Sequence, residues 1–130
     1  MFWTGETIVR KFVDAVNHED ATGAIALLDE NCVWIDSRDN RAEGAEECRE
    51  ALQTMFDSDA RFRIHIEEVV HRLDEYLISG HTESQGEHHT SRVLWRAKVS
   101  NGRLTNWQSY RDAATPSVAR LFPANSITLD

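Results

Sequence analysis

The stretch from Ser91 to Asp112 constrains the fold more than any other part of this sequence, because it predicts a β-hairpin. Two strand-like segments, rich in β-branched and aromatic residues, flank the dipeptide Asn101-Gly102. Both residues of this dipeptide tolerate a positive φ, which a two-residue hairpin turn requires. The arms carry Trp95 and Trp107, so the register of this turn decides where two of the four tryptophans point.

Before the hairpin, the spacing of apolar residues predicts three helices. Apolar stripes at helical spacing predict helices over residues 6–17 and about 45–58. Between them, Asp20 is a suitable N-cap for a second, shorter helix. The sequence therefore predicts two helices at the start of the chain and a third one that ends before residue 60.

The remaining segments predict strands. Residues 32–36 predict a short strand, and residues 37–44 predict a polar loop. From residue 60 apolar and polar side chains alternate, which predicts two strands over residues 60–85 with a bulge at Glu67-Glu68. Together with the hairpin, this order predicts an α+β fold. Its three N-terminal helices should pack on one face of a strongly curved, mainly antiparallel sheet.

Composition and charge limit what the protein can bind. A chain of 130 residues is long enough for one domain with one core. Its net charge of −8 disfavours nucleic acid and anionic membranes as partners, because both require a basic surface. The N-terminus has no signal-peptide pattern and no apolar run is long enough for a bilayer, which predicts a cytoplasmic protein. Cys32 and Cys48 predict two buried, reduced thiols.

Four motifs follow one another in a characteristic order: IVRKFVDAVNHEDATGAIALLDENCVWID, EGAEECREALQTMF, YLISGHTES and NGRLTNWQSYRD. In this order and spacing the chain resembles the nuclear transport factor 2-like superfamily and its SnoaL-like members. That superfamily includes polyketide cyclases, ketosteroid isomerase and limonene-epoxide hydrolase. The resemblance implies a cystatin-like cone over residues 1–112, followed by a C-terminal extension or lid over residues 113–130. Because the superfamily also contains binding modules and assembly domains, the fold alone does not give the function.

Strand alternation groups the residues that share a face of the sheet, and the resemblance implies which face lines the cone. The residues expected to face inward are Trp34, Asp36, Leu77, Ser79, His81, Glu83, Ser91, Val93, Trp95, Trp107, Ser109 and Arg111. Phe12 and Val16 of the first helix should close the floor. The predicted substrate-binding residues among them are Phe12, Val16, Trp34, Val93, Trp95, Trp107 and Ser109.

Asp36 is the first catalytic candidate. The resemblance places it where ketosteroid isomerases keep their proton-shuttling aspartate, at the end of the first strand. A carboxyl group at the mouth of an apolar cavity has a raised pKa and suits general-base work. The alternative is that Asp36 caps its own loop by binding the backbone of residues 37–40.

His81, Glu83 and Arg111 are the other catalytic candidates. His81 would act as an acid or proton relay, while Glu83 and Arg111 would orient and tune the pair. Arg111 would neutralise an acid or bind an anionic group of the substrate. The alternative is a buried polar cluster in which these three side chains satisfy one another.

Two departures from the resemblance disfavour the chemistry of well-known relatives. Phe12 and Trp95 stand where ketosteroid isomerase has a tyrosine and an acid that form its oxyanion hole. Ser109 stands where limonene-epoxide hydrolases have a second aspartate that activates water. Neither steroid isomerisation nor epoxide hydrolysis by these mechanisms is therefore expected.

The resulting functional prediction is a protein that binds a small apolar or aromatic molecule in the cone and acts on it by proton transfer, without a cofactor. The alternative is a non-enzymatic ligand-binding or dimerisation module whose cone is filled by side chains. A homodimer is expected through the convex sheet face, which should carry Leu94, Leu104 and Tyr110. No metal site is expected: His18, His65 and His71 show no constellation in the sequence, and His88-His89 lies in a predicted turn, where a metal would need ligands from elsewhere in the chain.

Overall fold

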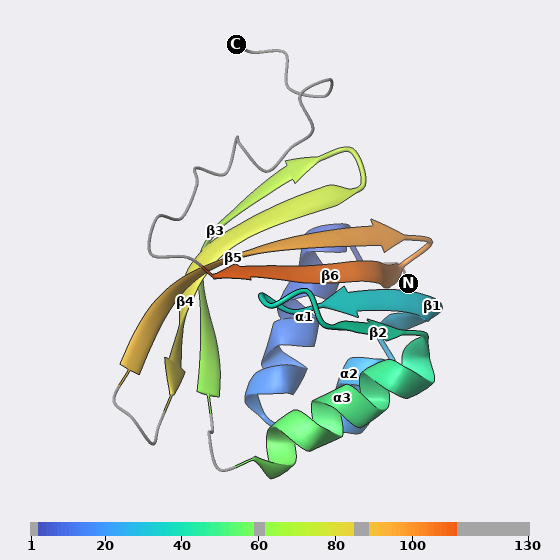
Figure 1. Cartoon of the computed structure of the whole chain (residues 1–130). Helices are drawn as coiled ribbons and strands as arrows, with labels where there is room; N and C mark the ends of the chain where they lie inside the picture. The colour runs from blue at the N-terminus through green and yellow to red at the C-terminus, as the bar shows by residue number, and fades with distance from the viewer. Residues whose placement is uncertain (1–2, 59–61, 85–88, 112–130) are drawn as a thin grey trace.

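Three helices lie on one side of a six-stranded sheet in the computed structural model, which describes residues 3–58, 62–84 and 89–111 (Figure 1). In chain order the elements are α1 (Gly5–Asn17), α2 (Ala21–Ile25), β1 (Leu28–Ile35), β2 (Arg41–Glu43), α3 (Ala45–Asp57), β3 (Phe62–Arg72), β4 (Glu75–Ser84), β5 (His89–Ser100) and β6 (Arg103–Arg111). The predicted α+β class is confirmed. The predicted extension or lid over residues 113–130 lies outside the described residues.

The sheet has the strand order β2-β1-β6-β5-β4-β3, and all neighbouring strands are antiparallel except β1 and β6. Asn101 and Gly102 join β5 to β6 with φ angles of 53° and 77°, so the predicted hairpin turn is confirmed. The short strand β2 lies within the predicted polar loop. Its central residue, Ala42, is buried between two exposed charged residues, and three residues are too few for such a pattern to distinguish a strand from a polar loop.

Polar side chains fix where the helices begin. The Thr4 hydroxyl accepts a hydrogen bond from the backbone N–H of Thr7 at 3.1 Å, and α1 follows. Asp20 caps α2 as predicted, since its carboxylate accepts from the backbone N–H of Gly23 at 2.9 Å. None of the helices in the described ranges is long and apolar enough to cross a membrane.

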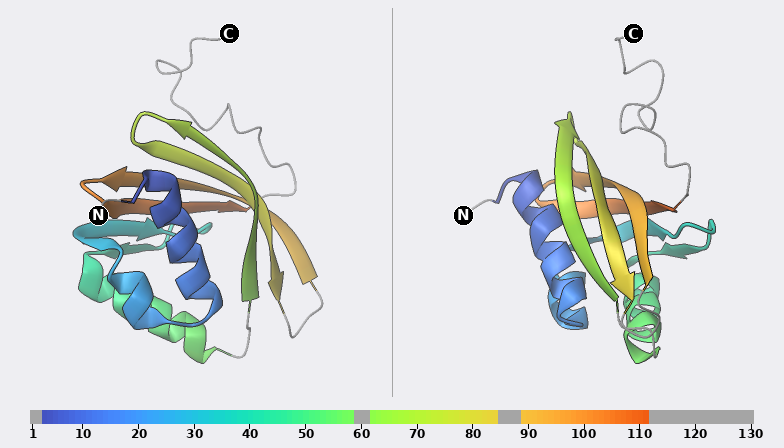
Figure 2. Two further views of the ribbon diagram at one scale, coloured as in Figure 1. Left: turned by 180° about the vertical axis from the view of Figure 1, so that it is seen from behind. Right: turned by 90° about the vertical axis from the view of Figure 1, so that its left-hand side faces the viewer.

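The helices cover a single face of the sheet. α1 packs against β3, β5 and β6, whereas α3 packs against β1 and β2 (Figure 2). Asn17 ties the end of α1 to β3, because its amide donates to the backbone oxygen of Ile64 at 2.9 Å and accepts from the N–H of Ile64 at 2.8 Å. We call the face covered by the helices the inner face and the opposite one the outer face.

The predicted bulge bends β3. The pairing of β3 with β4 shifts register between Ile66 and Glu68. Gly80 pairs with Ile66, and a Cβ atom at Gly80 would lie 2.0 Å from the backbone oxygen of His65. A glycine is therefore needed where β4 follows the bend of β3.

The two cysteines lie where α3 packs on β1. Both are free thiols and fully buried, as the sequence predicts. Cys48 Sγ lies 3.8 Å from the backbone oxygen of Cys32. They therefore belong to the core and are separate from the polar residues considered below.

Candidate functional site

The inner face gathers aromatic side chains around α1. Phe12, Trp95 and Trp107 are each 3% exposed. The ring centroid of Trp107 lies 4.9 Å from that of Phe12 and 6.3 Å from that of Trp95. Val16 and Val93 belong to the same buried cluster. The structure thus brings these five predicted binding residues together, and their binding role stays a prediction.

Trp34 stands at the margin of this aromatic cluster. It pairs with Trp107 across β1 and β6, and it is only partly buried. Its indole Nε1 is shielded from solvent but has no hydrogen-bond partner in the part of the chain that the structure describes. Met55 and Phe56, from the end of α3, are also partly buried against the hydrophobic core. Trp34 itself combines a partly exposed side chain with a buried N–H that has no acceptor among the described residues.

Ser109 and Arg111 occupy inner-face positions of β6. Ser109 is half-buried and pairs with Trp95, and the backbone of Arg111 pairs with Val93. Directly opposite residues of an antiparallel pair share one face. The register therefore agrees with the predicted face for both positions, although the side chain of Arg111 lies outside the described part.

The expectation that four residues of β4 line the inner face is wrong. β4 pairs with β5 so that Ile78 lies opposite Trp95 and Thr82 lies opposite Ser91. Even-numbered residues of β4 therefore share the inner face with odd-numbered residues of β5. The four misplaced residues lie on the outer face: Leu77, Ser79, His81 and Glu83.

Asp36 follows the last residue of β1 and caps its own loop. Its Oδ1 accepts hydrogen bonds from the backbone N–H groups of Arg38 and Asn40 at 2.8 and 2.9 Å, and its Oδ2 accepts from the Asn40 side chain at 2.9 Å. Burial acts to raise the pKa of Asp36, but these hydrogen bonds outweigh burial and hold the pKa below its usual value. The arrangement matches the loop-capping alternative, because a carboxylate held in this way is a weaker base than an apolar pocket would give.

An ionic cluster on the outer face surrounds His81. Its Nδ1 lies 3.0 Å from Glu67 Oε2, and Arg92 donates to Glu67 Oε1 at 3.2 Å. The ring of His65 stacks on His81 with centroids 4.7 Å apart, and His65 Nε2 contacts Glu83 Oε1. The hydrogen bond with His81, assisted by the charge of Arg92, holds the pKa of Glu67 below its usual value.

This cluster was not predicted from the sequence because its members come from three strands. His65 and His81 are direct partners between β3 and β4, and His81 is in turn paired with Arg92 of β5. The predicted bulge at Glu67-Glu68 was the available signal. It places both glutamates on the outer face, which the simple alternation of a strand does not do.

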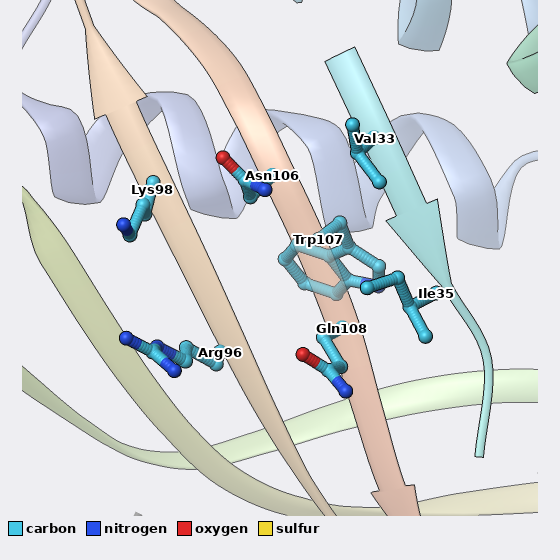
Figure 3. Close-up of a pocket in the computed structure, with 7 residues that line it drawn as sticks. All are labelled: Val33, Ile35, Arg96, Lys98, Asn106, Trp107 and Gln108. Carbon is cyan, nitrogen blue, oxygen red and sulfur yellow. The ribbon is translucent and has the colours of Figure 1, made fainter. Parts of the chain in front are cut away.

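A small hollow lies on the outer face between β1, β6 and β5 (Figure 3). In Figure 3 the ring of Trp107 lies behind β6, on the side of the helices. The volume of about 110 Å³ is well below the roughly 300–1,000 Å³ of typical ligand pockets. The hollow is lined by Val33, Ile35, Arg96, Lys98, Asn106, Trp107 and Gln108.

The outer face also carries apolar residues, but not all those expected. Leu94 is buried and pairs with the half-buried Tyr110. Leu104 lies in the inner core instead, because the register of β5 and β6 shifts beside Val99 and pairs Leu104 with that residue. A homodimer through the outer face stays a prediction.

Trp3 is the fourth tryptophan and lies apart from the aromatic cluster. It is 47% exposed, and the Lys11 ammonium lies 4.4 Å from its ring centroid. Both residues line a groove of about 510 Å³ on the solvent side of α1 and α2. Trp3 is therefore a suitable control position for substitutions of the tryptophans on the inner face.

Comparison with known proteins agrees with this architecture. Residues 9–107 match the SnoaL-like domain family. An NTF2-like protein of unknown function from Cytophaga hutchinsonii is 18% identical, with a TM-score of 0.73 over 86% of this chain and 93% of that chain. A cystatin-fold protein from Novosphingobium aromaticivorans is 13% identical, with a TM-score of 0.73 over 84% and 99% of the two chains.

An LEH-like epoxide hydrolase from M. tuberculosis is 21% identical, with a TM-score of 0.75 over 83% of this chain and 78% of that chain. No curated protein sequence matches the chain. At these identities the solved structures show a shared fold, and function has to be argued from the site itself.

Proposed function

The chain belongs to the SnoaL-like domain family of the nuclear transport factor 2-like superfamily, and we propose that it binds a compact, largely apolar or aromatic molecule on the inner face of its sheet. The aromatic cluster of Phe12, Trp95 and Trp107 supplies the apolar wall. Trp34 supplies the polar contact at the margin of this wall.

The proposal rests mainly on the indole N–H of Trp34, which is buried and has no acceptor among the residues that the structure describes. A buried donor without an acceptor costs about 1–3 kcal/mol, so such groups are rare in folded proteins. An acceptor on a bound molecule would recover this free energy. Tryptophan suits that role because its ring contacts apolar surface while its single N–H fixes the orientation of the ligand.

Other partly buried apolar residues at the edge of the core support the same interpretation. Met55 and Phe56 of α3 and Ile66 of β3 pack against the core without being fully covered. A ligand seated against them would remove this apolar surface from water, which contributes about 25 cal/mol for each Å². Ligand sites are commonly apolar with a few polar groups, and this margin has that composition.

The distribution of titratable groups favours binding over proton transfer by the predicted catalytic residues. His81 and Glu83 lie on the outer face, and the Asp36 carboxylate already accepts three hydrogen bonds from its own loop. None of these three groups is positioned to exchange a proton with a ligand on the inner face. We propose Arg111, whose backbone has an inner-face register, as the partner for an anionic group of the ligand.

The test uses the dye 1-anilinonaphthalene-8-sulfonate as a probe, with its fluorescence as the readout. Trp34→Phe keeps an aromatic ring and removes the N–H, so the affinity for the probe should fall about 2–10-fold, the value of one hydrogen bond. Trp3→Phe is the matched control and should bind the probe like the wild type. Asp36→Asn and His81→Ala should also leave the affinity unchanged.

Two results would contradict the proposal. One is a native protein that does not bind the probe. The other is an equal loss of affinity in Trp34→Phe and Trp3→Phe, which would show that binding does not depend on the inner face and could occur in the groove beside Trp3. A loss in His81→Ala with the melting temperature unchanged would instead favour a site on the outer face.

A further inference from the structure

We propose that His65, His81 and Glu83 bind a divalent transition-metal ion of the zinc type on the outer face of the sheet. One potential ligand atom from each residue lies within 4.8 Å of the others. Bonds of about 2.0–2.2 Å in a tetrahedral site place ligand atoms roughly 3.4 Å apart, so small side-chain rotations would close this group around an ion. The site lies on the opposite side of the sheet from the proposed ligand.

The backbone holds the two histidines in a fixed relation. His65 and His81 are directly opposite each other in the antiparallel pair of β3 and β4, and their rings are nearly parallel, with an angle of 17° between planes. Glu83 follows two positions along β4 and therefore shares their face. His65 Nε2 is shielded from solvent and has no hydrogen-bond partner within residues 3–58, 62–84 and 89–111, although it contacts Glu83 Oε1. Binding of an ion by both atoms would replace this direct contact and would give His65 Nε2 a partner.

Glu67 can hold the ring of His81 in place by a hydrogen bond, as carboxylates commonly do for histidines that bind metals. A proton on His81 Nδ1 would be donated to Glu67 Oε2 at 3.0 Å, which leaves the lone pair of Nε2 available for an ion. Arg92 binds the other oxygen of Glu67 at 3.2 Å and so holds the carboxylate in place. The bulge in β3 is what brings Glu67 to this position beside His81.

The chemistry of the donors decides which ion is expected. Two imidazole nitrogens and one carboxylate oxygen suit zinc and its neighbours in the first transition row, whereas magnesium and calcium prefer oxygen donors throughout. His65, His81 and Glu83 are partly exposed, with side-chain exposures of 42%, 28% and 56%. An ion can therefore reach the site from solvent and clamp β3 to β4 beside the bulge.

The experiment measures Zn²⁺ binding to the metal-free, untagged full chain by isothermal titration calorimetry. We expect one Zn²⁺ per chain and a rise in melting temperature when Zn²⁺ is added. Glu67→Gln should weaken binding by about 10–100-fold, because it removes the carboxylate that holds the metal-binding histidine His81. His65→Ala, His81→Ala and Glu83→Gln should each weaken it by more than Glu67→Gln does, and Zn²⁺ should no longer stabilise these variants.

Matched histidine controls keep the proposal falsifiable. His18→Ala, His71→Ala and the double variant His88→Ala/His89→Ala remove the other histidines of the chain and should keep the wild-type affinity. The proposal is overturned if the wild type does not bind Zn²⁺ or if His65→Ala binds it normally. Loss of binding in the double variant alone would likewise overturn it, because the ion would then be held elsewhere. Melting temperatures measured without metal show whether a variant that fails to bind Zn²⁺ has lost only a metal-binding side chain or has also lost its fold.

Discussion

The inner and outer faces of one sheet carry opposite chemistry. On the inner face, Trp95 and Trp107 pack against α1 and are almost completely buried. On the outer face, the ionic cluster around His81 lies in partial contact with solvent. Arg96 and Glu75 form a separate ion pair further along β5 and β4. The residues of the two faces alternate along the same strands, so the step from Trp95 to Arg96 changes a buried apolar side chain into a charged one, although the outer face also holds the buried Leu94.

The sheet therefore separates the aromatic residues proposed to bind the ligand from the ionic cluster around His81. A molecule held by the tryptophans cannot reach the imidazole of His81, because the backbone of β4 and β5 lies between them. The two proposed sites are therefore independent, and each can be tested by variants that leave the other intact. Substitutions on opposite faces but adjacent in sequence are the most direct way to examine the division.

The largest expected effect is the difference in the free energy of unfolding between Trp107→Ala and Gln108→Ala. Trp107 is buried against Phe12 and Trp95, so its loss leaves a cavity and should lower the free energy of unfolding by about 3–5 kcal/mol. Gln108 lies at the rim of the outer hollow, and its truncation should change stability by no more than about 0.5 kcal/mol. Urea denaturation of both variants measures the contrast, and equal losses would show that the faces are not distinct.

A smaller effect is expected for Gly80→Ala, which tests the bend that both faces share. The new Cβ atom would lie 2.0 Å from the backbone oxygen of His65, so β3 and β4 would have to move apart. Forcing extra volume into a packed site costs about 1–3 kcal/mol. The neighbouring outer-face variant Ser79→Ala is the control, and it should be nearly neutral in the same urea titration. A Gly80→Ala protein as stable as Ser79→Ala would mean that the strands approach each other less closely.

The fold could be predicted from the sequence because its signals are local. Asn101-Gly102 has the dipeptide chemistry of a tight turn, and Asp20 has the side chain of an N-cap. The phase slip at Glu67-Glu68 marked the bulge for the same reason. Each of these signals is contained in a few consecutive residues.

The candidate site was less predictable because it depends on how strands pair. In β4 both sets of alternating residues contain large apolar side chains, Tyr76 and Ile78 on one side and Leu77 on the other. Alternation alone therefore could not decide which set faces the helices. The shift beside Val99, which turns Leu104 inward, is likewise a property of two strands together.

Asp36 is the acid that was expected on the inner face. Its substitution should have the smallest of these effects on stability, and that effect should depend on pH. Asp36→Ala removes three hydrogen bonds and should lower the free energy of unfolding by about 1–2 kcal/mol near pH 7. Ser37→Ala, an exposed residue of the same loop, is the control and should have little effect. Urea denaturation across a range of pH values measures both.

The sign of the pH dependence follows from the lowered pKa of Asp36. Because the pKa in the folded state lies below the unfolded value of about 3.9, the stabilisation is complete well above that pH and is lost as pH falls through the folded pKa. The gap between wild type and Asp36→Ala should therefore be constant near neutral pH and shrink in acid. A general base with a raised pKa would behave oppositely, since ionising it would destabilise the fold as pH rises. A gap that widens in acid would contradict the loop-capping interpretation and would return Asp36 to the catalytic candidates.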